Sequence, residues 1–245
     1  MVQGFLVMNK EIKQNAFTDT ERLTGFTNMD GPQNRIISKR FIDLISDNID
    51  FSKVRTVLEI GSRDGCQALE LSRWFPNATV YSFEPNPSAL DWVRKNAAMC
   101  SRIVVVPFAV SEVTGEVSFY EVVNGNIGAS SLYKVNHPRS FEWQQREIKV
   151  QSVRLDEWLD NKGIDQVDIV WADVQGAEGP VFRSLGKYLN EVKAIATEVA
   201  IQPLYDGSTL KSDLDNILSS FQCIDSMIES TGTESDAVYI RKDLV

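Results

Sequence analysis

The sequence predicts an α/β fold, doubly wound around a mostly parallel seven-stranded sheet with an antiparallel terminal edge strand. Two observations carry this prediction. From residue 54 onward, short runs rich in β-branched residues alternate with amphipathic segments at the spacing of βαβ units. The last two expected strands, at 222–228 and 236–241, follow each other closely, as antiparallel neighbours do. Right-handed crossovers would then place helices on both faces of the sheet.

The elements follow one another in a regular order. Apolar residues at helical spacing, among them Ile42, Ile45 and Ile49, predict an amphipathic helix before the first strand. The seven main strands are expected at 54–60, 79–83, 103–108, 167–172, 193–201, 222–228 and 236–241. The connecting helices are expected at 64–75, 87–99, 179–191 and 210–221. Further strands at 116–122 and 148–155 and a short helix at 156–160 complete the pattern.

One domain with an N-terminal extension accounts for the 245 residues. Residues 1–35 are polar and weakly periodic, and we interpret them as an extension or lid. Residues 36–245 are expected to form the domain, with a loop-rich insertion at about 116–147. The extension and the loop at 124–147 flank the predicted crevice, so both are candidates to close over a substrate, although packing on the surface is the simpler interpretation.

Charge and composition exclude several function classes. The net charge of −9 repels polyanions, so no nucleic-acid partner is expected. Three scattered cysteines and a single histidine predict neither disulfides nor a metal site. No apolar run is long enough for a membrane span, and the first residues lack a basic leader. A cytoplasmic location is therefore expected.

The first chemical motif lies between the expected strand at 54–60 and the helix that follows it. Gly61 lets the chain turn close to a ligand, and the helix N-terminus offers free N–H groups to an anion. A dinucleotide fingerprint would need glycine where Arg63 stands, which makes NAD the weaker interpretation. The spacing instead suits a cofactor without pyrophosphate, such as S-adenosylmethionine, although glycines after a strand are often structural. The candidate residues are Glu59, Gly61, Ser62, Arg63 and Gly65.

A second motif places an acid at the end of the next strand. Glu84, followed by Pro85 and Asn86, stands about 20 residues beyond the glycine turn, where nucleotide-binding folds place the acid that accepts ribose hydroxyls. The structural alternative is a turn or cap before the next helix. Both motifs together favour ribose binding.

A third motif, Asp173 to Glu178, ends the fourth parallel strand and points polar groups into the same crevice. Both acids are candidates to orient a substrate or take its proton. The alternative is capping by Asp173 and a solvated Glu178 near the positive end of the helix dipole.

In this order, the motifs resemble the FkbM family of S-adenosylmethionine-dependent methyltransferases from about residue 54 to 240. The resemblance rests on LEIGSRDG at 58–65, FEPNP at 83–87, FAVS at 108–111, GASSL at 128–132, VRLDEW at 153–158, VDIVWADVQGAE at 167–178 and EVAIQPLYDG at 198–207. It implies a class I methyltransferase fold. The chain departs from the family's K-x-D-V-E-G-x-E pattern, because Trp171 replaces the lysine and Gln175 the first glutamate.

The resemblance also implies a role for each motif. The turn at 61–65 would hold the methionine end of S-adenosylmethionine and Glu84 its ribose. Asp173 would lie near the sulfonium. The neighbourhood of adenine would be formed by Ala109, Val110 and Ser111.

The implied function is methyl transfer to a hydroxyl of a sugar, in a glycan or a secondary metabolite, which yields S-adenosylhomocysteine. A hydroxyl nucleophile gains from a base, and the candidates are Asp173, Glu178, Glu198 and His137. The alternatives are an RNA ribose or protein side chain as acceptor, or a cofactor-binding protein without transfer activity. The expected partner is a small-molecule or carbohydrate acceptor, and the terminal edge strands could pair across a homodimer.

Overall fold

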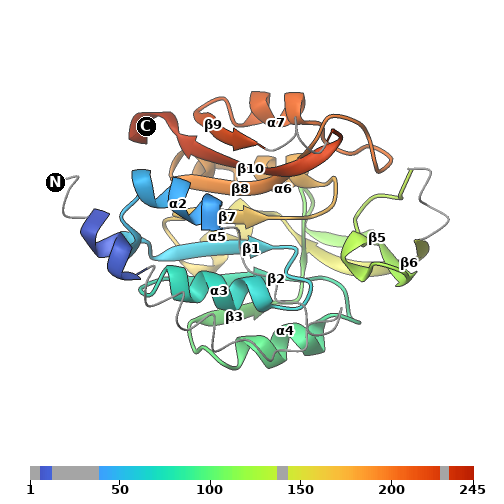
Figure 1. Cartoon of the computed structure of the whole chain (residues 1–245). Helices are drawn as coiled ribbons and strands as arrows, with labels where there is room; N and C mark the ends of the chain where they lie inside the picture. The colour runs from blue at the N-terminus through green and yellow to red at the C-terminus, as the bar shows by residue number, and fades with distance from the viewer. Residues whose placement is uncertain (1–5, 13–38, 137–142, 227–231) are drawn as a thin grey trace.

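The computed structural model describes residues 6–12, 39–136, 143–226 and 232–245. Its centre is a seven-stranded sheet in the order β3-β2-β1-β7-β8-β10-β9 (Figure 1). These strands are β3 (Ile103–Val106), β2 (Thr79–Phe83), β1 (Thr56–Ile60), β7 (Ile169–Ala172), β8 (Ala194–Ala200), β10 (Glu234–Arg241) and β9 (Phe221–Ser226). The fold class is confirmed. The antiparallel strand is β10, which lies between β8 and the edge strand β9.

Helices cover both faces of the sheet, which is why β1 is buried along its whole length. Side chains alternate along the strand: Val57 packs against one face with α2 (Lys39–Asn48) and α3 (Cys66–Trp74). Leu58 packs on the opposite face with α5 (Leu155–Lys162), α6 (Glu178–Ser184) and α7 (Lys211–Ile217). Helix α4 (Leu90–Ala97) lies against α3 and β3. The two cores hold the sheet rigid from both sides.

A second sheet, in the order β4-β6-β5, occupies the segment expected to be rich in loops. Strands β5 (Gly115–Asn124) and β6 (Gln144–Val153) pair as antiparallel neighbours, and the two-residue β4 (Ala109–Val110) runs parallel to β6. Strand β6 begins four residues before the predicted 148. Figure 1 shows this sheet beside one end of the main sheet, where it forms a side wall.

Two predicted elements differ from the structure. The strand expected at 103–108 ends at Val106, since Pro107 has no N–H to continue the ladder, and β4 begins beyond it at Ala109. The helix expected at 179–191 is α6 followed by the 3-10 helix η4 (Gly186–Asn190), and Gly186 has a left-handed φ of 51°. The other 3-10 helices among the described residues are η1 (Phe51–Lys53), η2 (Ile127–Ala129) and η5 (Lys242–Leu244).

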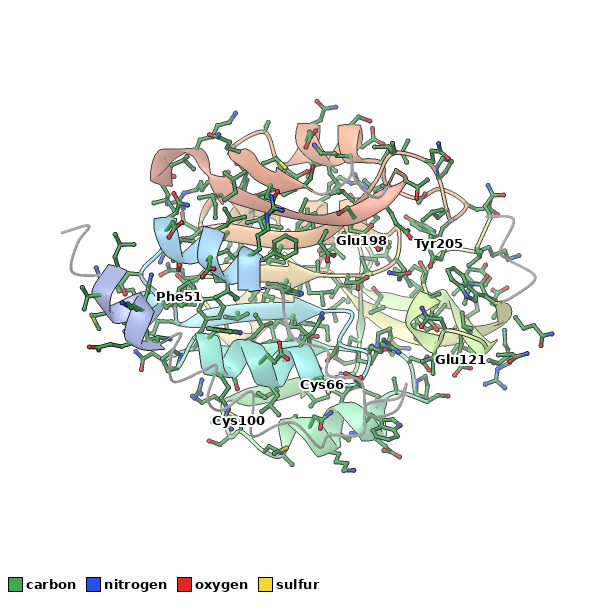
Figure 2. The ribbon with its side chains drawn as sticks, in the orientation of Figure 1. Phe51, Cys66, Cys100, Glu121, Glu198 and Tyr205 are labelled. Atoms are coloured by element: carbon green, nitrogen blue, oxygen red, sulfur yellow. The ribbon has the colours of Figure 1, made fainter. Side chains whose placement is uncertain are left out.

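Within the expected N-terminal extension, residues 6–12 are described and are helical. The buried Asn9 side chain donates to the carbonyls of Ser46 and Ile49 at 2.8 and 2.7 Å and accepts the N–H of Phe51 at 2.8 Å. Phe51 is labelled beside this helix in Figure 2. The rest of the extension lies outside the described residues, so its division from the domain stays a prediction. In the parts of the chain that are described, no helix could span a membrane.

Candidate active site

A cleft with about 580 Å³ of empty space, part of it open to solvent, lies at the carboxyl ends of β1, β2 and β7. The second sheet and η2 close its far side. Its walls are largely apolar, with two carboxylates and one cation among the described lining residues, as in ligand sites generally. The residues that line it are Ile60, Gly61, Arg63, Phe83, Glu84, Pro85, Asn86, Ala89, Phe108, Ala109, Val110, Phe119, Ile127, Gly128, Ser130, Ser131, Leu132, Asp173 and Val174.

The glycine turn after β1 leaves no space for a side chain at its first position. Gly61 has a φ of 86°, and a Cβ built there would lie 1.9 Å from the carbonyl oxygen of Asp173. The N–H of Gly61 donates to the Phe83 carbonyl at 3.0 Å, and the Asp173 N–H donates to the Ile60 carbonyl at 3.0 Å. Bare backbone therefore joins the ends of three neighbouring strands and forms one edge of the cleft.

Glu84 accepts two backbone hydrogen bonds beside this turn. Its Oε2 accepts the N–H of Arg63 at 2.6 Å, and its Oε1 accepts the N–H of Asn86 at 2.8 Å. Burial raises the pKa of Glu84 to about 7, although these two N–H groups oppose the shift. Each carboxylate oxygen has two lone pairs, so Glu84 can still accept hydrogen bonds from a ligand diol.

Glu59 is buried beneath the turn and is 1% exposed. Neither carboxyl oxygen has a hydrogen-bond partner among the described residues. Burial raises the pKa of Glu59 to about 8, and the nearby hydroxyls of Ser82 and Ser62 oppose this only in part. Glu59 is therefore mostly protonated at neutral pH in the folded chain.

This raised pKa makes stability depend on pH. The folded chain keeps a proton on Glu59 that the unfolded chain releases near pH 4.5. The stability that this proton gives the folded chain is therefore complete below pH 4.5 and is lost as the pH rises toward about 8. We expect the free energy of unfolding to fall between pH 5.5 and 8, with Glu59 contributing at most about 3 kcal/mol of the loss. Denaturant unfolding of Glu59→Gln, which mimics the protonated acid, should show a shallower slope. Equal slopes for wild type and variant would contradict the assignment.

Three of the four candidate bases gather at the ends of β7 and β8. Asp173 lines the cleft, and the Gln175 side chain joins it to Glu198. Oε1 of Glu178 accepts the N–H groups of Val174 and Gly176 at 3.2 and 3.3 Å. Burial raises the pKa of Glu178 to about 7. The fourth candidate, His137, lies outside the described residues.

Burial also raises the pKa of Glu198 well above its usual range, and the charges of Asp173 and Glu178 raise it further. Figure 2 shows Glu198 and Tyr205 at the same end of the sheet. In the described part of the chain, no group of three or more acidic, His or Cys side chains has the geometry to hold a metal ion.

Residues 127–136, here called the strap, cross above these strand ends. Val135 pairs with Tyr205 in an antiparallel bridge, and the N–H of Asn136 donates to the Leu204 carbonyl at 2.8 Å. The hydroxyl of Ser131 donates to the Gln175 carbonyl at 2.8 Å. The strap thus connects the second sheet to the loops after β7 and β8, and its first residues line the cleft.

Most of the expected cofactor residues line this cleft: Gly61, Arg63, Glu84, Pro85, Asn86, Ala109, Val110 and Asp173. Glu59, Ser62 and Gly65 are absent from the lining, and the Ser62 hydroxyl accepts from Ser82 at 2.7 Å. Ser111 does not line the cleft either, because its hydroxyl pairs with that of Ser152 at 2.8 Å.

The sequence did not suggest the aromatic walls, Phe83, Phe108 and Phe119. It also gave no role to Gln175 or Tyr205. The aromatic residues at the strand ends were a usable signal for a stacking surface. No sequence signal pointed to the contact between Gln175 and Tyr205, because that contact depends on how loops distant in the chain pack together.

Comparison with known proteins decides the family. The model of the methyltransferase FkbM domain matches residues 58–232. This chain belongs to the FkbM methyltransferase family. The FkbM protein described here is thus an S-adenosylmethionine-dependent methyltransferase.

Individual relatives of the FkbM chain agree with this assignment. It is 29% identical over 176 residues to the 2-O-methyltransferase NoeI of Sinorhizobium fredii (strain NBRC 101917 / NGR234). This alignment covers 69% of this chain and 72% of NoeI. It is 26% identical over 162 residues to Methyltransferase 1 of Beauveria bassiana (strain ARSEF 2860), in an alignment that covers 59% of this chain and 64% of the relative. The bifunctional kinase-methyltransferase WbdD shares the fold, with a TM-score of 0.50, 14% identity and coverage of 89% of this chain and 42% of WbdD.

The cleft of this FkbM chain fits the cofactor chemically. S-adenosylmethionine presents a ribose diol, which donates hydrogen bonds, and a cationic methionine end. Glu84 can accept from a diol, and the glycine turn at Gly61 lets a ligand approach the backbone. Asp173, the other acid in the cleft lining, can face the cationic end.

Proposed function

We propose that this FkbM methyltransferase transfers a methyl group from S-adenosylmethionine to a hydroxyl oxygen of a sugar, in a glycan or a secondary metabolite. The observation that carries the proposal is the Asp173 carboxylate, which lines the cleft at the end of β7 close to Glu178 and Glu198. A hydroxyl acceptor needs a group that takes its proton, and a carboxylate does so. The name of the relative NoeI, a 2-O-methyltransferase, supports an oxygen acceptor.

Each part of the site then has a role. The bound cofactor supplies an electrophilic methyl group, and the protein aligns the acceptor with it. Glu84 accepts hydrogen bonds from the ribose, and the turn at Gly61 holds the methionine end. Ala109 and Val110 pack against the adenine. Asp173 orients the acceptor hydroxyl and takes its proton.

The charge of the chain argues against a polyanionic acceptor. A net charge of −9 repels a phosphate backbone, and the cleft lining holds two acids, Glu84 and Asp173, against one cation, Arg63. A neutral, hydroxyl-rich sugar meets no such barrier, and its hydroxyl groups can donate to carboxylates. These features favour a sugar over an RNA ribose.

A panel of acceptors tests this function. We expect S-adenosylhomocysteine to be released with neutral sugars or glycosylated metabolites, and the product sugar to gain one O-methyl group by mass spectrometry. Release with RNA or with protein acceptors instead would replace the sugar by one of those classes. No release across the whole panel, with cofactor binding intact, would favour a binding protein without transfer activity.

Cofactor binding itself is tested at Glu84. Titration calorimetry should give micromolar binding of S-adenosylhomocysteine to the wild type, about −8 kcal/mol. Glu84→Ala should weaken this binding by about 1 to 3 kcal/mol, because a charged hydrogen-bond acceptor is removed. The exposed Glu116→Ala variant on β5 is the control and should bind as the wild type does. A folded wild type that binds no S-adenosylhomocysteine would refute the cofactor assignment at this cleft.

A further inference from the structure

The side-chain amide of Gln175 lies between two carboxylates and a tyrosine hydroxyl. Its Nε2 donates to Asp173 Oδ1 at 2.7 Å and to Glu198 Oε2 at 2.9 Å. Its Oε1 accepts a hydrogen bond from the Tyr205 hydroxyl at 2.8 Å. Both hydrogens and the oxygen of the amide are therefore in use.

Tyr205 determines which way this amide faces. The residue is 2% exposed, and its hydroxyl lies 2.8 Å from the amide oxygen of Gln175 and 3.2 Å from the carbonyl oxygen of Ala129. Burial and then the charge of Glu198 raise the pKa of Tyr205, so its hydroxyl stays protonated and remains a donor. A donor at Oε1 directs Nε2 toward the two carboxylates.

The backbone of Gln175 is held in an unusual conformation. Its φ is 55°, a left-handed value that residues other than glycine rarely adopt. The Ser131 hydroxyl binds its carbonyl from the strap, and the next residue, Gly176, is also left-handed with a φ of 96°. The surrounding structure thus maintains a strained residue beside the cleft, at the point where its side chain reaches both acids.

The amide lies between two acids whose negative charges would repel each other if both were ionised. Asp173 and Glu198 come from the ends of neighbouring strands, and Glu178 of α6 and two acids of β10, Glu234 and Asp236, surround Glu198. Like charges this close favour protonation, or movement of one side chain away from the others. A neutral group that donates to both Asp173 and Glu198 offsets the repulsion.

We propose that Gln175, oriented by Tyr205, is a positioning residue that keeps the Asp173 carboxylate directed into the cleft. Through Asp173 it sets the preference of the cleft for a cationic cofactor over its neutral product. This inference rests on the proposed function, because it takes the cleft as the cofactor site. S-adenosylmethionine and S-adenosylhomocysteine differ by one methyl group and one positive charge, so the ratio of their affinities measures this effect.

The experiment is titration calorimetry of both ligands into the full chain. Gln175→Leu removes the two donors and the acceptor at similar size. We expect it to weaken binding of S-adenosylmethionine about tenfold and to change binding of S-adenosylhomocysteine less than threefold. Tyr205→Phe keeps the amide and removes the hydroxyl that orients it. It should lower the affinity for S-adenosylmethionine, relative to that for S-adenosylhomocysteine, about threefold. The control is Gln151→Leu on β6, an exposed glutamine, which should leave the ratio unchanged.

The outcomes separate this inference from the cofactor assignment. Binding of S-adenosylhomocysteine to the wild type decides whether the cleft is the cofactor site. The ratio of the two affinities in the variants decides the role of Gln175. A purely structural role would weaken both ligands equally in Gln175→Leu, and that result, or an unchanged ratio, overturns the proposal. If Gln175→Leu does not fold, Tyr205→Phe decides by the same ratio.

Discussion

Gly61→Ala is expected to abolish measurable cofactor binding and to lower the free energy of unfolding by about 3 kcal/mol or more. The added Cβ would lie 1.9 Å from the carbonyl oxygen of Asp173, and backbone atoms cannot yield as a flexible side chain does. The end of β1 would have to move away from the end of β7. This movement separates the Gly61 turn from Asp173, two parts of the same cleft wall.

Gly163→Ala provides the matched control for this experiment. Gly163 follows α5 with a left-handed φ of 64°, but a Cβ there meets nothing within 4 Å. It should cost only the backbone strain, about 1 kcal/mol, and leave the affinity for S-adenosylhomocysteine unchanged. Denaturant unfolding and calorimetry measure both quantities. If Gly61→Ala binds S-adenosylhomocysteine like the control, the close contact of turn and ligand that we propose is wrong.

The main sheet could be predicted because its signals are local. A strand such as β1 is buried on both faces, so most of its residues are apolar or β-branched, and the run ends at Gly61. The second sheet was missed in part, since β6 alternates weakly at its start and its order comes from pairing with β5 along the whole hairpin. Register between distant segments depends on both partners and on the chain between them.

The site shows the same division between local and distant information. Glu84 and Asp173 stand directly after buried strands, and parallel strands bring such ends together at one edge. Ser111 was expected near the adenine, but the strand before it turns its hydroxyl toward Ser152 on β6. Gln175 looked only like a departure from a family pattern. Gln175 and Tyr205 are 30 residues apart in the chain, so the sequence alone does not reveal their contact.

Asp173→Asn is expected to lower kcat for methyl transfer by about 10² to 10⁴-fold, the range for loss of a general base. The amide has nearly the same shape as the carboxylate but cannot take the proton of the acceptor hydroxyl. S-adenosylhomocysteine should bind within threefold of the wild-type affinity, because Glu84 and the turn at Gly61 are untouched. Single-turnover assays with the acceptor found in the panel, together with calorimetry, separate the two effects.

Asp91→Asn is a suitable control, because the Asp91 side chain is 95% exposed on α4 and pairs with Arg94 at 3.4 Å. It should leave both kcat and affinity unchanged. An unimpaired kcat in Asp173→Asn would mean that another acid is the general base. Glu178 is the first to test, because its pKa of about 7 suits proton transfer at neutral pH. Loss of S-adenosylhomocysteine binding would instead mean that the variant disturbs the cleft wall, since Asp173 and the Gly61 turn share it.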